Sequence, residues 1–517
     1  MKDKSSSTSS SRKSTIFTVQ LAAISAVLFV IIFASRPDYA GILKQVFKKS
    51  SNPVPSTENV IQHLKNLEKL AAKHDNSRSV ANGHAASVDY VLTELGKLNE
   101  TFTYYTQEVS VNVQVDEEPP FFLIKTSKTT NITFKPRLEV ATYPGSGSVV
   151  LEKVPVIFVS ACSVNQVFEK DWIAAIDTSL SLPCTVCQRF VEAIDAGARG
   201  VVLYNQPGNT KGYPHALPPQ PGRCGRDPEN HKKIRTIGAV QLSDYAAFQF
   251  LSQYASYPDT KASLTVASVY REYISKNVIA DSIQGDPDSI VVFGSHLDSV
   301  PAGPGVNDDG SGAMATLELA NYFHQYLAQK TVQKLRFTWW TGEEIGLLGS
   351  AHYINDLKQH NPSELTKIVL NIDTDMIASP NYVRGVWSGN NLKEPILYQE
   401  CKSIHMLFKE YFTQKGLPIV EFEFNGRSDF QPFLDAGIPA GGVITGEDEI
   451  KTVEQAQLFG GVSGMVLDPC YHQDCDRVQG ILGSGVVIME QNMGALGHAL
   501  DTFALATDIQ QLLNPVN

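Results

Sequence analysis

The sequence predicts an α/β protein whose central sheet is mixed, mostly parallel and flanked by helices. Residues 289–293 are apolar and β-branched, as in a buried strand, and residues 313–326 have the pattern of an apolar helix. Between them lie His296, Asp308 and Asp309, and open α/β sheets place their active sites at this carboxyl edge of the strands. Glycines on both sides of the two acids allow tight turns that aim them inward. This pattern indicates a metal site rather than a surface loop with stray acids.

The length and charge of the chain limit the range of functions. With 517 residues, 43% of them hydrophobic, it can bury a substantial core and is expected to form two domains after an N-terminal extension. Its 43 basic and 54 acidic residues give a net charge of −11, which argues against nucleic acid as a partner.

The N-terminal extension divides into three parts. Residues 1–14 form a basic tail that we expect to be cytoplasmic, and residues 15–34 are a nearly uncharged apolar run. About 20 apolar residues suffice to span a bilayer, whereas a cleaved signal peptide usually has an apolar core of about 7–15. Because no small-x-small cleavage site follows, an uncleaved signal-anchor that contacts the membrane is favoured over a signal peptide. Residues 35–55, rich in Pro, Ser and Lys, are expected to be a stalk.

Two features favour the secretory pathway, with the catalytic body in a vacuole-like or lysosome-like lumen, held at the membrane, or secreted. Asn99 and Asn131 each begin an Asn-x-Thr glycosylation sequon, and the close cysteines Cys470 and Cys475 are expected to form a disulfide. The chain has seven cysteines, so at least one is left free or bridges to another chain. The sequence does not determine how the other five pair, namely Cys162, Cys184, Cys187, Cys224 and Cys401.

The segment before residue 137 contains elements with no sign of chemistry. Ser56 caps a predicted helix whose apolar residues recur at helical spacing, and a second helix is expected over residues 86–98. Separate strands are expected at 104–108 and 121–124.

Residues 137–267 differ from the rest of the chain in their sequence pattern, which predicts short strands and many turns and includes four of the seven cysteines. A helix ended by Gly197 and followed by a strand over 200–205 forms a small βαβ-like unit. Cys184 and Cys187 could be a redox or zinc pair, although a disulfide to another cysteine is favoured. His215 and His231 stand alone, so we expect an inserted non-catalytic domain that acts as a lid or gating surface. It resembles the protease-associated domain, whose Ala-Gly-Ala-x-Gly-Val and Tyr-Asn motifs are met, with Cys184 at the cysteine position and the Phe position unmatched.

Acidic pairs follow two further predicted strands. Glu343 and Glu344 come after the aromatic strand 335–340, where one could bind a metal while its neighbour faces a water; a favourable charge at a helix N-terminus is the competing interpretation. Asp373 and Asp375 share one face of the strand over 368–377, and either could be a ligand.

His472 lies between Cys470 and Cys475, and a disulfide loop would hold this imidazole rigidly. The loop could instead serve only to staple the surface. Taken together, two histidines and several acids without thiolates favour zinc, with manganese or cobalt possible. Two metals need about three to four ligands each, and two His, a terminal Glu, a terminal Asp, a bridging Asp and a shared water meet that demand.

These motifs resemble those of the co-catalytic two-zinc aminopeptidases with a protease-associated insert, the family of vacuolar aminopeptidase Y and its secreted fungal relatives. The likeness is strongest over residues 277–350, 375–381, 426–442 and 468–476. It implies a zinc-exopeptidase-like peptidase domain over residues 56–136 and 268–517. An α+β protease-associated domain over residues 137–267 would interrupt it, and two Zn²⁺ would bind per chain.

The resemblance also implies roles for single residues. Glu343 would be the general base and Tyr471 an oxyanion donor, while Asp298 would bond the free nitrogen of His296 and fix its tautomer. Asp375 is preferred to Asp373 as the ligand, and Asp308 is the bridging carboxylate. The implied zinc ligands are His296, Asp308, Glu344, Asp375 and His472.

The implied activity is hydrolysis of the N-terminal bond of peptides with a free N-terminus, by a dizinc-bridged hydroxide whose proton Glu343 takes. Glu343, Asp375 and Asp429 are candidates for holding the substrate α-amine. A carboxypeptidase of the same fold needs a cationic cluster, and the site motifs contain only Arg427. Two further hypotheses are a non-catalytic receptor-like relative, without metal ligands, and a single-zinc cyclase of N-terminal glutamine.

Overall fold

The computed structural model describes residues 53–126, 131–136, 139–164, 171–180, 182–206 and 228–515, without the side chains of 228, 229 and 231. The predicted tail, signal-anchor or signal peptide and most of the stalk lie outside these residues, as do Cys224, His215 and the His231 side chain. Within the described ranges, none of the helices combines the length and the apolar character needed to cross a membrane.

The central sheet has the strand order β13-β12-β14-β11-β9-β10-β8. The pairs β10–β9, β9–β11, β11–β14 and β12–β13 are parallel. The pairs β8–β10 and β12–β14 are antiparallel. The predicted mixed, mostly parallel sheet is therefore confirmed. The bounds are β8 Lys261–Ser282, β9 Asp286–His296, β10 Gln333–Trp340, β11 Ile368–Thr374, β12 Gly385–Ser388, β13 Val420–Glu423 and β14 Ala440–Ile444.

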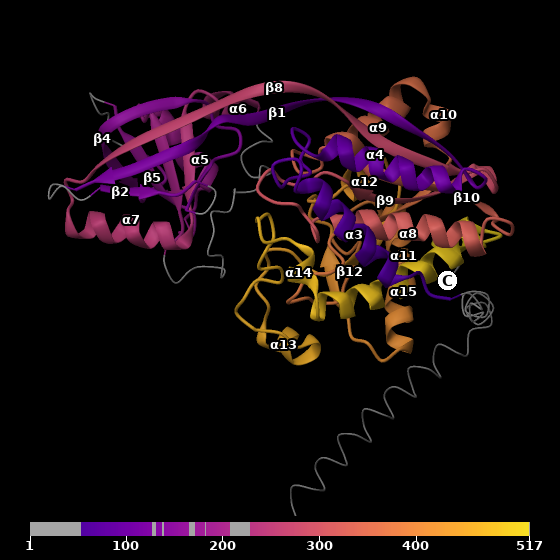
Figure 1. Cartoon of the computed structure of the whole chain (residues 1–517). Helices are drawn as coiled ribbons and strands as arrows, with labels where there is room; N and C mark the ends of the chain where they lie inside the picture. Colours follow the sequence, from indigo (N-terminus) through magenta and orange to yellow (C-terminus); the bar gives the residue numbers. More distant parts are fainter. Residues whose placement is uncertain are drawn as a thin grey trace, which may run out of the picture. The chain divides into compact units, whose positions relative to one another are not determined.

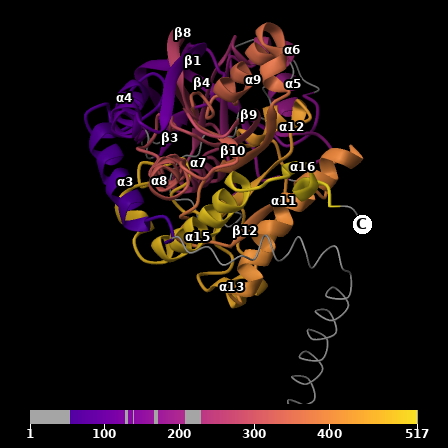
Figure 2. The ribbon, with the colours of Figure 1, turned by 90° about the vertical axis from the view of Figure 1, so that its right-hand side faces the viewer.

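Helices cover both faces of this sheet, because successive side chains of a strand point to opposite sides. Trp339 donates its indole N–H to the carbonyl of Ala313 in α8 (Gly310–Tyr326), at 2.8 Å. Its neighbour Trp340 packs on the other face, against Tyr353 of α9 (Leu348–His360) and Phe433 of α12 (Phe430–Asp435). Figure 2 shows α8 and α15 (Ser484–Ala504) on one side of the strands and α9 and α12 on the other.

Of the remaining helices, α3 packs against α8 and α15, and α10 packs against α9 (Figure 1). The predicted cap of the first helix is confirmed, since the Ser56 hydroxyl accepts the N–H of Asn59. The bounds are α3 Thr57–Ala71, α4 His84–Leu95, η1 Gly96–Leu98, α10 Pro362–Leu365, α11 Pro395–Gln414, α13 Val453–Phe459, α14 Val478–Ile481 and α16 Ile509–Leu513.

The expectation of two separate strands at 104–108 and 121–124 was wrong. They belong to one strand, β1 (Phe102–Lys125), which pairs with β8 along its whole length. Residues 116–120 are rich in acids and prolines, but two register shifts in this stretch leave the ladder with β8 unbroken. A further difference concerns β11, which ends at Thr374, so that Asp375 lies just beyond the strand instead of within it.

A second group of strands continues from β8 in the order β4-β5-β6-β7-β3, with β4 to β7 parallel and β2 pairing with β1. Two clusters of buried side chains lie here, around Phe122 and Phe250 and around Trp172 and Phe190. The predicted helix and strand near Gly197 are present as α5 and β6. The bounds are β2 Asn131–Phe134, β3 Val140–Thr142, β4 Val149–Val159, β5 Ile173–Asp177, β6 Gly200–Tyr204, β7 Gly238–Leu242, α5 Val186–Asp195, α6 Pro228–Ile234 and α7 Asp244–Ser256.

The cysteines and sequons are placed as follows. Cys162 pairs with Cys184, and Cys470 with Cys475, as predicted for the latter pair. Cys187 also takes part in a disulfide, and Cys401 is a buried free thiol. The side chains of Asn99 and Asn131 are both exposed.

A buried ion pair ties β10 to β8, and its loss should destabilise the fold. Arg336 donates two hydrogen bonds to Asp281, at 2.6 and 2.8 Å, and others to Tyr353 and Glu364. We expect Arg336→Met to lower the free energy of unfolding by about 3–5 kcal/mol, because a buried carboxylate loses its partner. The exposed pair of Arg271 and Glu117 is the matched control, and Arg271→Met should cost less than about 1 kcal/mol in urea unfolding. Equal losses in the two variants would contradict this expectation.

Candidate metal centre

Three neighbouring parallel strands deliver the predicted site residues to one edge of the sheet. His296 is the last residue of β9, Glu343 follows the end of β10, and Asp375 follows the end of β11. Since β9 lies between β10 and β11, the carboxyl ends of all three strands meet. Asp308 lies in the loop between β9 and α8 and approaches the same edge.

The Asp308 carboxylate lies between the two predicted histidines. Its Oδ1 is 3.3 Å from Nε2 of His296, and its Oδ2 is 3.0 Å from Nε2 of His472. One carboxylate with an imidazole at each oxygen is the arrangement that a bridging ligand between two metal ions requires. Residues 176 positions apart in the chain (472 − 296) are thereby brought together.

The other predicted ligands lie next to one imidazole each. Nε2 of His472 is 3.0 Å from Oε2 of Glu344, and Nε2 of His296 is 3.7 Å from Oδ1 of Asp375. Glu343, the predicted base, has its Oε2 3.9 Å from Nε2 of His296. The five residues predicted as ligands therefore form two adjoining groups that share Asp308, with Glu343 beside them.

Asp309 is a competing ligand candidate, because one of its oxygens lies within 4.8 Å of ligand atoms of His296 and Asp375. Its Oδ1, however, accepts the N–H of Gly312 at 2.8 Å and of Met376 at 3.1 Å. The first of these bonds caps helix α8. Asp309 therefore supports α8 and the Met376 backbone through Oδ1, while its buried Oδ2 has no hydrogen-bond partner among the described residues.

The electrostatics of the centre are dominated by buried acids. Burial by itself lowers the pKa of His472, but Glu344 and Asp308 outweigh burial and raise it to about 10. Burial likewise opposes the charge on His296, yet Glu343, Asp308 and Asp375 raise its pKa well above the usual range. Burial raises the pKa of Glu343, and the neighbouring Glu344 adds to the shift. Without a metal, the acids thus hold protons on the imidazoles, and a divalent cation would compete with those protons.

The buried ligand atoms are suited to a cation. Four of them have no hydrogen-bond partner in the described part of the chain, although buried polar atoms are normally satisfied. Carboxylate oxygens and imidazole nitrogens are the donors that zinc and related divalent ions take. These atoms are Nε2 of His296, Oδ2 of Asp308, Oε1 of Glu344 and Oδ1 of Asp375.

Asp298 supports the centre differently from the expectation. Nδ1 of His296 is 3.2 Å from the backbone carbonyl of Asp298 and 3.8 Å from its carboxylate. The carboxylate instead accepts the backbone N–H of Glu343, at 3.2 Å. Asp298 therefore joins the β9 end to the β10 end, and its carbonyl is the nearer partner of the His296 ring.

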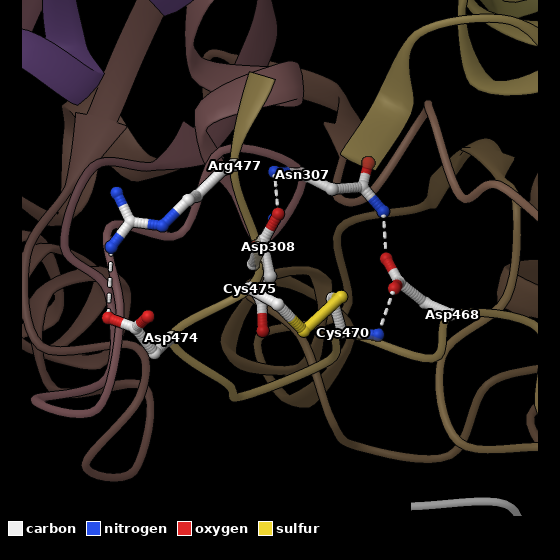
Figure 3. Close-up of a disulfide and its surroundings, with 8 residues drawn as sticks. Asn307, Asp308, Asp468, Cys470, Asp474, Cys475 and Arg477 are labelled. Atoms are coloured by element: carbon white, nitrogen blue, oxygen red, sulfur yellow. Dashed lines mark hydrogen bonds and ion pairs between the residues drawn. A yellow bond between two sulfur atoms is a disulfide. The ribbon is translucent and has the colours of Figure 1, made fainter. Parts of the chain in front are cut away.

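The loop that carries His472 is held at several points. Asp468 accepts one hydrogen bond from the Asn307 side chain, at 2.6 Å, and another from the Cys470 backbone, at 2.8 Å (Figure 3). The Tyr471 ring stacks on His472 with centroids 3.8 Å apart, and its hydroxyl accepts a hydrogen bond from Arg427 at 3.3 Å. The disulfide Cys470–Cys475 closes this loop on itself, and Asp468 connects it to the Asp308 loop through Asn307.

Asp429 and Asp373 form a layer next to the centre. Asp429 is fully buried and accepts a hydrogen bond from the Ser350 hydroxyl, while Asp373 accepts one from Ser428 at 2.9 Å. Burial raises the pKa of Asp429 to about 7. No contact between Asp429 and the five candidate ligands is found within hydrogen-bond distance in the described residues.

A third acidic group, Glu447, Asp448 and Glu449, lies near Tyr471 but does not resemble a second metal site. Arg427 forms ion pairs with Glu447 and with Asp448, the latter at 2.9 Å. The terminal nitrogens of the guanidinium neutralise these two carboxylates, while its buried Nε has no hydrogen-bond partner among the described residues.

Sequence reasoning missed two buried charges that hold the Asp308 loop. The Asp476 carboxylate accepts the backbone N–H groups of Asn307 and Asp308, and Arg78 donates to carbonyls of the same loop. Asp476 lies in the stretch 468–476 that carries the predicted ligand His472, and this closeness in sequence could have indicated a role near the centre. Arg78 lies between α3 and α4, where nothing in the local pattern indicates a link to the centre.

Comparisons with known proteins give a consistent result. The model of peptidase family M28 matches residues 277–496, which contain the whole candidate centre. Over 459 residues the chain is 34% identical to a protein of Aspergillus fumigatus named "probable leucine aminopeptidase 2", covering 87% of this chain and 84% of that protein.

Two solved structures are similar in fold. An aminopeptidase from an Aneurinibacillus species has a TM-score of 0.61 at 19% identity, covering 89% of this chain and 96% of that one. A zinc aminopeptidase from Bacillus subtilis has a TM-score of 0.60 at 18% identity, covering 86% of this chain and 94% of that one.

Proposed function

The chain belongs to peptidase family M28 and is a peptide-bond hydrolase, and on this basis we propose that it is a two-zinc aminopeptidase. The observation that carries the proposal is the Asp308 carboxylate, whose two oxygens each face one imidazole, of His296 and of His472. Each imidazole has a further carboxylate beside it, from Asp375 and Glu344 respectively.

We assign one zinc to His296 and Asp375 and the other to His472 and Glu344, with Asp308 shared. Three ligand carboxylates carry three negative charges, which favours two divalent cations over one in so buried a site. The Bacillus subtilis protein of similar fold is a zinc aminopeptidase by name, which agrees with this donor set, although that likeness by itself concerns the fold.

When bound, the ions would acidify a shared water and polarise the scissile carbonyl. We assign the proton transfer to Glu343. Its carboxylate is nearly buried, lies 3.9 Å from Nε2 of His296 and is absent from the proposed ligand set. It would accept the proton of the attacking water and deliver it to the leaving amine. The Asp298 carboxylate holds the Glu343 backbone and so orients this base.

Tyr471 is proposed to stabilise the oxyanion with its phenol. The ring is stacked on His472 and its hydroxyl points to Arg427, so it lies at the edge of the centre and carries a donor. Burial raises the pKa of this phenol well above its usual range, which keeps the donor proton in place.

The charges around the centre favour an amine over a carboxylate as the bound end of the substrate. Acids surround the centre. Glu343 and Asp375 both lie beside the His296 imidazole and are our candidates to face an α-ammonium group. Asp429, which is buried behind Ser350, would stabilise the α-ammonium group through its electrostatic field more than by direct contact. A carboxypeptidase needs a free cation, but Arg427 is already paired with Glu447 and Asp448. A receptor-like protein without activity would not need the complete ligand set.

The choice between amine and carboxylate recognition can be tested with blocked substrates. A free α-amine desolvated among acids contributes a charged hydrogen bond, so we expect N-acetylation of a leucyl peptide to reduce kcat/KM at least about 100-fold. Amidation of the C-terminus of the same peptide should change kcat/KM less than about threefold. Cleavage of the acetylated peptide together with rejection of the amidated one would favour a carboxypeptidase. Zinc stoichiometry near one, with cyclisation of N-terminal glutamine, would favour the cyclase.

We also propose that residues 137–267 are a protease-associated domain and that the body of the protein lies in the secretory pathway. The parallel strands β4 to β7 with α5 support the first proposal. The disulfides Cys162–Cys184 and Cys470–Cys475 support the second, because such bonds persist in oxidising compartments.

A further inference from the structure

Arg78 is a fully buried cation that contacts only backbone oxygens among its described side-chain hydrogen bonds. Its Nε donates to the carbonyl of Pro304 at 2.7 Å, and its two terminal nitrogens donate to the carbonyls of Leu297 and Gly305. A buried guanidinium without a direct carboxylate partner is expensive, so its three donor contacts to one loop call for an explanation.

These three carbonyls lie at the two ends of the loop that separates the candidate ligands His296 and Asp308. Leu297 directly follows His296, and Gly305 lies three residues before Asp308. One rigid guanidinium therefore joins the start of the loop to its end. Gly305 has φ +60°, and a Cβ there would lie 2.3 Å from the Asp308 carbonyl, so the loop closes too tightly for a side chain at this point.

The residues beside Arg78 reinforce the same loop. The backbone N–H of Arg78 donates to the Ser299 hydroxyl at 3.0 Å, and that hydroxyl donates to the carbonyl of Gly303 at 2.9 Å. The hydroxyl of Ser77 donates to the carbonyl of Val300, at 3.0 Å. The turn between α3 and α4 thus holds the loop along most of its length.

Asp476 holds the loop from the other side. Its carboxylate accepts the backbone N–H of Asn307 at 2.7 Å and of Asp308 at 3.0 Å, and its carbonyl accepts the N–H of Val306 at 3.2 Å. Asp476 lies four residues after His472, so the same segment carries the second imidazole. The cation binds the carbonyls of the loop, and the anion binds its N–H groups.

We propose that Arg78 is a positioning residue which, with Asp476, clamps residues 297–308 so that His296 and Asp308 are held at metal-binding separation. The clamp rests on the proposed function, because its purpose is to preorganise the zinc site. A planar fork with three donors to three carbonyls is required, and a lysine ammonium on a shorter stem cannot reproduce it.

The test compares Arg78→Met and Arg78→Lys with Arg336→Met, which also removes a fully engaged buried arginine but touches no residue of the loop. We expect the zinc Kd, measured by chelator competition, to weaken about 10- to 100-fold in Arg78→Met. Arg78→Lys should recover part of that loss. Arg336→Met should lower the stability of the protein with and without zinc and change the zinc Kd less than about twofold.

A second readout does not depend on metal. In the zinc-free protein, hydrogen exchange at the Val306, Asn307 and Asp308 amides should quicken at least tenfold in Arg78→Met and in Asp476→Asn, but not in Arg336→Met. If Arg78→Met fails to fold, Ser299→Ala, which removes one connection between Arg78 and the loop, takes its place with a smaller expected change in both readouts.

The outcomes separate the clamp from the proposed function. Wild-type zinc affinity and unchanged loop exchange in Arg78→Met, or in Ser299→Ala and Asp476→Asn, would overturn the clamp and leave the peptidase centre intact. A wild-type protein that binds no zinc would overturn the proposed function, while the exchange measurements would still decide whether Arg78 and Asp476 order the loop.

Discussion

Glu343→Gln should reduce kcat by about 100- to 10,000-fold while the protein keeps both zinc ions, because the amide cannot accept the proton of the attacking water. The substitution is nearly isosteric, and Glu343 is not among the five proposed ligands, so KM and the melting temperature should change little. The measurements are steady-state kinetics on an aminoacyl chromogenic substrate and metal content after gel filtration.

The neighbouring Glu344 provides the matched control for this experiment. Glu344→Gln replaces a residue whose carboxylate lies 3.0 Å from Nε2 of His472, so we expect it to lose zinc as well as activity. The two adjacent variants should therefore differ in metal content. Glu343→Gln should be inactive with both zinc ions bound, and Glu344→Gln should be inactive with less zinc bound. If Glu343→Gln lost both zinc ions along with its activity, Glu343 would be a ligand and its role as the base would be wrong.

The second large effect is expected at the bridging carboxylate. Asp308→Ala should release both ions, because both imidazoles lose the carboxylate that they share, whereas Asp375→Ala should release only the ion beside His296. In zinc titrations we expect about two tightly bound zinc ions in the wild type. We expect at most one in Asp375→Ala and none in Asp308→Ala. Turnover should fall below detection in Asp308→Ala.

Zinc-dependent stability provides an independent readout for the same variants. A ligand that binds only the folded protein stabilises it by about 2.7 kcal/mol at 100 times its Kd. Wild type should gain stability of this order when saturating zinc is added to the metal-free protein, and Asp308→Ala should gain almost none. Retention of two ions in Asp308→Ala would show that this carboxylate does not bridge, and the competing candidate Asp309 would then have to be tested.

Local patterns predicted most of the elements that carry the centre. The apolar strands before His296 and before Glu343 are present as β9 and β10, and the Ser56 cap begins α3. These elements are readable because strand periodicity, helix caps and turn residues act over a few neighbouring positions. The same local reasoning failed between residues 108 and 121, where two separate strands were expected. The long partner strand β8 instead carries β1 through with two register shifts.

The likeness to two-zinc aminopeptidases predicted the same set of side chains that the structure brings together at one sheet edge. The residues by themselves left the choice between Asp373 and Asp375 open. In the folded chain, β11 ends at Thr374 and Asp375 lies 3.7 Å from His296, whereas Asp373 bonds Ser428 in the layer behind, and this arrangement favours Asp375 as the proposed ligand.

The amino-acid sequence was enough to predict the α/β class, the strand ends that supply acids and imidazoles, and the disulfide pair around His472. How the loop 297–308 is held is evident only in the folded chain, since Arg78 and Asp476 reach it from more than 150 positions away. The physical reason is that a buried charge is stabilised by partners in space, and hydrogen bonds between side chains and a distant backbone leave no periodic or compositional trace. The candidate centre can therefore be predicted from the sequence as a set of proposed ligands, whereas the distances between those residues depend on the fold around them.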